Sequence, residues 1–127
     1  MIVRYDPFDA PDPAEWLALD EDERIQLVQD YHRRARVRLP NARLHASMHT
    51  VVENQIALGG EIPVRRTVQR LMAEGLDRHE AIHAVAWVLS GIMFDFTRRP
   101  ASAAEVDLKG PYYAALEQLT AESWRQS

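Results

Sequence analysis

The chain has 127 residues, of which 46% are hydrophobic and 27% charged, and this composition is typical of a globular protein rather than a disordered or fibrous one. The formal net charge of −4 argues against a dedicated nucleic-acid-binding protein, because such proteins neutralise phosphates with clustered basic groups. No apolar stretch reaches the roughly 18 residues of a membrane span, and residues 1–9 lack the basic and apolar regions of a signal peptide. We therefore expect a cytoplasmic protein without a membrane partner, with one helical domain over residues 1–127.

The chain contains no cysteine, which narrows its possible chemistry. Disulfides, iron–sulfur clusters, thiolate-bound zinc and a cysteine nucleophile are all excluded. Any metal ion must therefore be held by nitrogen and oxygen atoms.

Residues 1–12 are predicted to form an irregular, extended arm. Proline follows Asp6, Ala10 and Asp12, and each proline disfavours helical geometry at the residue before it. A short helix is expected to begin at Pro13. We expect Phe8 and Trp16 to pack on the chain's own core, and the alternative is that they anchor a partner.

A longer helix is predicted from Asp20 to about Val37, because Asp20 and Glu23 have the spacing of a capping box and Pro40 follows the end. One stripe of this helix is expected to face the core, and its members are Ile25, Val28, His32 and Ala35. We interpret His32 as a hydrogen-bonded core residue. Basic side chains gather near the end of this helix, and they are Arg33, Arg34, Arg36, Arg38 and Arg43. A solvated helix face is the favoured interpretation, and a patch for phosphate or an acidic partner is the alternative.

The next predicted helix begins after Asn41, a favourable cap, and ends at Leu58 before a pair of glycines. Its apolar stripe is expected to face the core and consists of Leu44, Met48, Val51, Gln55 and Leu58. A second line of His45, His49 and Glu53 runs beside that stripe. These side chains could flank a groove between helices or face water.

Three further helices are predicted. One begins near Pro63 and ends at Gly75, and a last one covers about residues 111–125. Between them, Asp77 caps a helix from His79 to about Phe96 that is apolar all round, including Trp87 and Phe94, and is therefore expected to be central and buried. No convincing strand alternation occurs. The fold class predicted is all-α, a bundle of four main helices with one or two short extra helices.

Possible metal ligands recur at intervals of four residues in two of these helices. His45, His49 and Glu53 form one set, and His79 with His83 forms the other. Side chains with this spacing are neighbours on a helix surface and can share one ion. We therefore predict a site for zinc, iron, manganese or nickel at His49, Glu53, His79 and His83, with His45 as a further member. A purely structural, hydrogen-bonded cluster is the alternative.

Two short patterns overlap with this set. Residues 79–83 match the zinc-protease pattern H-E-x-x-H, in which Glu80 would act as general base, although Glu80 is equally a capping-box partner of Asp77. The spacing of His49 with Glu53, followed by His79 with His83, looks like the middle of the hemerythrin pattern. No histidine follows His83, so the sequence favours one metal ion over two.

The same residues carry a resemblance to a known family. The chain has Leu44, His45, His49, Glu53 and Gln55, followed by Gly75, Asp77, His79, Glu80, Ala81 and His83. This pattern resembles an uncharacterised family of small bacterial proteins, the domain of unknown function numbered eighteen-forty-one, over Leu44 to Leu89. The resemblance implies a shared site and supplies no reaction.

Two functional hypotheses follow. The first is a helical bundle that binds a divalent metal through His49, His79 and His83, with Glu53 as a fourth ligand or as a hydrogen-bond acceptor for a ligand. His45 or His32 would be an outer member of this site. Such a site could support hydrolytic or redox chemistry on a small molecule. The second hypothesis is a non-catalytic protein-interaction module with structural histidines.

Overall fold

The computed structural model describes residues 2–37, 40–60, 62–97 and 109–126. These ranges contain helices and no strand, which confirms the all-α class. The helices are α1 (Pro13–Leu17), α2 (Glu21–Arg34), α3 (Ala42–Leu58), α4 (Val64–Ala73), α5 (Arg78–Thr97), α6 (Lys109–Gln118) and α7 (Ala121–Gln126). Within these ranges, no helix combines the length and the apolar character that crossing a bilayer requires.

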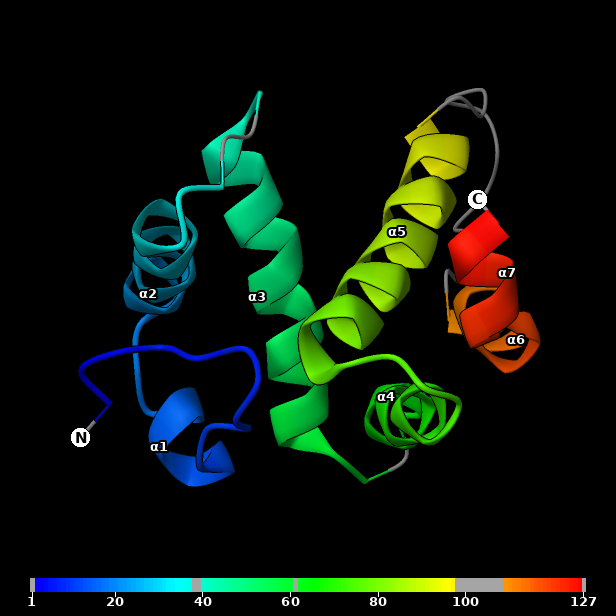
Figure 1. Ribbon diagram of the computed structural model, residues 1–127, viewed down its shortest axis with the longest axis horizontal. Coiled ribbons are helices and arrows are strands. Elements are labelled where there is room, and N and C mark those ends of the chain that lie inside the picture. Colours follow the sequence, from blue (N-terminus) through cyan, green and yellow to red (C-terminus); the bar gives the residue numbers. More distant parts are fainter. Residues whose placement is uncertain (1, 38–39, 61, 98–108, 127) are drawn as a thin grey trace.

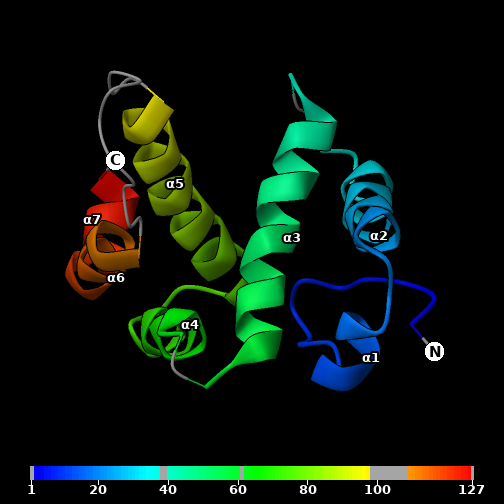
Figure 2. The same cartoon turned by 180° about the vertical axis from the view of Figure 1, so that it is seen from behind.

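Helix α3 runs through the middle of the molecule and contacts α1, α2, α4 and α5. Figure 1 shows α1 and α2 on one side of α3, with α4 and α5 on the other. Views from the front and from behind show that α3 and α5 are close together near α4 and diverge away from it (Figures 1 and 2). Helices α6 and α7 lie on the side of α5 that faces away from α3.

Two hydrophobic clusters hold these helices together, and α3 contributes to both. One cluster joins the N-terminal arm to α1, α2 and α3 and consists of Tyr5, Trp16, Ile25, Val28 and Ala46. The other joins α3 to α4, α5, α6 and α7, with Val52, Leu71, Ile82, Val85 and Leu116 among its members. Trp16 is fully buried, as predicted, and its indole N–H donates to Asn54 Oδ1 at 2.9 Å. Phe8 is exposed, so its predicted core position is wrong.

Three predicted helix starts are confirmed, two of them with a capping hydrogen bond and the third, at Asp20, without one. The Asn41 side chain accepts from the Leu44 N–H at 3.0 Å, and Asp77 accepts from the Glu80 N–H at 2.8 Å. Asp20 does occupy the N-cap position of α2, but the predicted capping box is wrong, because the Asp20 side chain makes no capping hydrogen bond. Helix α2 also ends at Arg34 rather than Val37, because the backbone turns at Arg36, which has φ 59°.

Three further expectations were wrong, two of them because periodicity does not show how many neighbours surround a helix. The predicted apolar stripe of α3 is not its buried side, since Leu44 is 56% and Leu58 59% exposed. Helix α5 is not buried all round, because Trp87 is 65% exposed although Val85 and Leu89 on either side of it are buried. The last predicted helix is divided into α6 and α7, because the Thr120 hydroxyl accepts from the Ser123 N–H and begins a new helix.

Candidate metal centre

The five histidines of the chain come together where α2, α3 and α5 approach one another. The ring centroids lie 4.7 Å apart for His32 and His45, 4.9 Å for His45 and His83, and 4.2 Å for His79 and His83. One potential ligand atom from each of His32, His45, His49 and His83 lies within 4.8 Å of all the others. Nitrogens that share one ion at about 2.1 Å lie at most about 4.2 Å apart, so these four residues could hold an ion after small ring movements, and the predicted ligand His79 is not in this set.

Each helix supplies its histidines for a local reason. The spacing of four residues puts His45 above His49 on α3 and His79 above His83 on α5. His32 lies on the buried stripe of α2 together with Ile25 and Val28. Its place in the cluster depends on the packing of α2 against α3, which its own sequence neighbours do not indicate.

All five imidazoles carry a buried nitrogen without a hydrogen-bond partner. Within the described ranges, the buried and unpaired side-chain nitrogens and oxygens are His32 Nε2, His45 Nε2, His49 Nδ1, His79 Nε2 and His83 Nε2. An unpaired buried polar atom costs roughly 1–3 kcal/mol, so natural proteins keep very few of them. Five such atoms therefore lie in one place, each available to a further partner.

The hydrogen bond of His32 determines which of its nitrogens is free. Its Nδ1 lies 2.9 Å from the backbone carbonyl oxygen of Val28. A carbonyl oxygen only accepts, so Nδ1 carries the proton and Nε2 keeps its lone pair. A backbone carbonyl in this position is a common partner of metal-bound histidine, because it sets the tautomer and the direction of the ring.

A chain of hydrogen bonds determines the tautomer of His49 in the same way. The Tyr5 hydroxyl donates to Glu53 Oε2 and lies 2.7 Å from His49 Nε2. Because tyrosine has a single proton, its oxygen must accept from His49 Nε2–H. The lone pair of His49 is therefore on Nδ1, the atom that has no other partner.

Arg78 holds the Glu53 carboxylate at the end of this chain. Its guanidinium donates to Glu53 Oε2 at 2.7 Å and to Oε1 at 2.8 Å, and it also donates to the Pro7 carbonyl at 3.0 Å. Arg78 is 7% and Glu53 1% exposed. The carboxylate is thus paired with Arg78 and Tyr5, and it is not among the side chains whose ligand atoms converge. Sequence reasoning missed Tyr5 because it lies far from the histidines along the chain, and it missed Arg78 because nothing beside His79 indicates a pairing with Glu53, 25 residues earlier.

The cluster is electrically neutral near neutral pH. Burial lowers the pKa of His83 to about 3 and that of His79 to about 4, with a smaller contribution from neighbouring imidazoles. The pKa of His49 is lowered well below its usual value, and those of His32 and His45 are also lowered, in each case mainly by burial. Neutral imidazoles have the free lone pairs that a metal ion requires.

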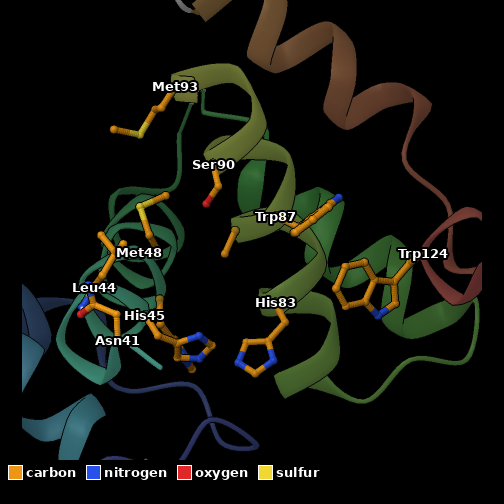
Figure 3. A pocket seen from close by; sticks show the side chains of 11 residues that line it. Asn41, Leu44, His45, Met48, His83, Trp87, Ser90, Met93 and Trp124 are labelled. Atoms are coloured by element: carbon orange, nitrogen blue, oxygen red, sulfur yellow. The ribbon is translucent and has the colours of Figure 1, made fainter. Parts of the chain in front are cut away.

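The cluster borders a pocket of about 520 Å³ between α3 and α5. His45, His49 and His83 line it together with apolar side chains that include Leu44, Met48, Trp87, Met93 and Trp124. Figure 3 shows His45 from α3 and His83 from α5 with their rings facing each other at one end. Asn41 and Ser90 are the other polar residues that line it.

Two other features singled out in the sequence, the residue Glu80 and the cluster of arginines, do not belong to the histidine site. Glu80 is exposed at the start of α5, and its backbone N–H bonds to the Asp77 cap, which the structure favours over a role as general base. In the basic cluster, Arg33 pairs with Asp30 and Arg43 with Asp22 on the surface. Arg38 lies outside the described residues.

Comparison with known proteins identifies the family of the chain. Neither a curated protein nor a solved structure shows a significant match. Residues 12–110 match a family described as Domain of unknown function (DUF1841). This match includes α1 to α5 and all five histidines, and it extends well beyond the segment that carried the resemblance in the sequence. The chain therefore belongs to the family of domains of unknown function DUF1841.

Proposed function

We propose that this protein binds a divalent transition-metal ion between α2, α3 and α5. The observation that carries the proposal is the set of five buried imidazole nitrogens without partners, one from every histidine of the chain. The two tautomers set by Val28 and Tyr5 support it, because each leaves a lone pair on the unpaired nitrogen. A cluster that served only to stabilise the fold would be expected to satisfy these atoms by hydrogen bonds.

The donor set narrows the choice of metal. Glu53 was predicted as a ligand or as an acceptor for one, and its pairing with Arg78 favours the second role, through Tyr5 and His49. The remaining donors are all imidazoles, which suit zinc, iron and nickel better than manganese, whose preferred donors are oxygens. When bound, such an ion can act as a Lewis acid or activate a water molecule. The chain would contribute the orientation of the rings and the exclusion of bulk water.

Elemental analysis of protein purified without a histidine tag tests the proposal. We expect near-stoichiometric zinc, iron or nickel, or binding of one of these ions during titration of metal-free protein. The double variant His79→Ala/His83→Ala should lose the metal. Glu80→Gln is the matched control, because Glu80 is between the two histidines in sequence but exposed, and it should retain the metal.

The structural alternative makes the opposite prediction. If the histidines serve only to pack the helices, metal content and titration heats stay near zero in the parent chain and in both variants. That result would contradict the proposal. Circular dichroism of each variant separates a loss of ligands from a loss of the fold.

A further inference from the structure

The pocket beside the histidine cluster has two kinds of wall, and they differ in chemistry. Leu44 and Met48 of α3, Trp87 and Met93 of α5, and Trp124 of α7 make most of it apolar. His45 and His83 lie at one end (Figure 3), and His49 also lines the pocket. His49 is 1% exposed and lines the pocket, and its Nδ1 lacks a partner. An apolar chamber with a few convergent polar atoms is the usual form of a small-molecule site, and its volume lies within the common range of about 300–1,000 Å³.

Resting on the proposed metal function, we propose that this pocket binds an apolar monocarboxylate, with the carboxylate on the metal ion and the hydrocarbon part between α3 and α5. Charge is the first argument. The imidazoles are neutral ligands, so a divalent ion among them keeps its full positive charge in a buried place. The nearby carboxylate of Glu53 is already neutralised by Arg78. An anionic donor from the ligand would therefore be favoured.

The exposed apolar side chains are the second argument. Leu44, Trp87 and Met93 are 56%, 65% and 44% exposed, and all three line this pocket. Covering such side chains with a hydrocarbon chain removes apolar surface from water. Trp87 and Trp124 also lie at the pocket, so binding should change the tryptophan fluorescence.

Calorimetric titration of zinc-loaded and metal-free protein with butyrate, hexanoate and octanoate tests this inference. We expect each added methylene to lower the dissociation constant about two- to fourfold, because each adds buried apolar surface. Octanoate should bind the zinc-loaded protein at least tenfold more tightly than the metal-free protein. 1-Octanol, which has the same chain length without the negative charge, should show little preference for the zinc-loaded form.

Two leucines of α3 provide matched variants for the apolar wall. Leu44 and Leu58 are on the same helix and are 56% and 59% exposed, and only Leu44 lines the pocket. Leu44→Gln should weaken octanoate binding about threefold or more, because a hydrocarbon contact is lost. Leu58→Gln should leave it unchanged, and both variants should bind zinc as the parent does.

The outcomes separate this inference from the proposed function. Octanoate binding that is equal with and without zinc, or independent of chain length, would overturn the inference. Zinc binding without any octanoate binding would overturn it as well, and the metal function would stand. A chain that binds no zinc, iron or nickel would contradict the proposed function and the inference that rests on it.

Discussion

Replacing Arg78 by methionine is expected to destabilise the fold strongly, because it leaves a buried carboxylate without its partner. The guanidinium makes two bonds to Glu53, at 2.7 and 2.8 Å, and one to the Pro7 carbonyl at 3.0 Å. Both members of the pair are almost fully buried. Removing one partner of a buried ion pair typically costs about 3–5 kcal/mol, whereas an exposed pair contributes about 0–1 kcal/mol. We therefore expect Arg78→Met to lower the free energy of unfolding by roughly 3–5 kcal/mol.

Urea unfolding of the metal-free protein, followed by circular dichroism, measures this loss. The double variant Glu53→Gln/Arg78→Met removes the uncompensated charge and keeps an acceptor for the Tyr5 hydroxyl. Its destabilisation should be smaller than the sum of the two single variants by roughly 0.5–3 kcal/mol. A loss below about 1 kcal/mol for Arg78→Met, the value of an exposed pair, would refute this reasoning. If the destabilisation of the double variant equals the sum of those of the two single variants, the coupling between Glu53 and Arg78 is refuted.

Three further predictions concern the histidine cluster. Tyr5→Phe should keep the fold but weaken zinc binding about 10–100-fold, because His49 loses the group that sets its tautomer. Calorimetry measures this change, and an unchanged zinc affinity would contradict the role of Tyr5. Zinc at 100 times its dissociation constant should stabilise the fold by about 2.7 kcal/mol, which appears as a higher melting temperature that EDTA reverses. An unchanged melting temperature would argue against a zinc site in the folded state. The pH dependence follows from the lowered pKa values of His79 (about 4) and His83 (about 3). Above pH 6.5 both are neutral in the folded and unfolded chain. Below it only the unfolded chain takes up protons, so the stability of the metal-free protein should fall as pH falls from 6.5 to about 4, by at most about 1.4 kcal/mol per pH unit for each histidine. A flat urea midpoint across this window would contradict it.

Local features of the sequence were sufficient to predict most of the helices. The caps at Asn41 and Asp77 and the glycines after α3 and α4 act within one turn of the chain, so their effect does not depend on distant packing. The intervals of four residues likewise place His45 with His49 and His79 with His83 on shared helix faces. Local chemistry was also misleading in places: Asp20 has the spacing of a cap but makes no capping bond.

Tertiary packing decided which of these faces is buried. In α3 the side with His49 and Glu53 is enclosed by neighbouring helices, while Leu44 and Leu58 remain in contact with solvent. An apolar stripe predicts a buried face only where one side of a helix is covered, and α3 is contacted by four helices. The same reasoning explains Trp87, which lies on an uncovered side of α5 although Val85 and Leu89, two residues away in either direction, are buried.

The sequence by itself determined the all-α class, the main helix starts and the two histidine pairs, because each depends on residues within a few positions of one another. Only the tertiary structure decided that His32 joins the cluster, that Glu53 pairs with Arg78, and that Tyr5 links Glu53 to His49. The hydrogen bonds that connect Tyr5, His49, Glu53 and Arg78 join residues that are 25 to 48 positions apart in the chain. Their formation depends on the docking of the N-terminal arm, α2, α3 and α5, and no local pattern in the chain encodes that docking.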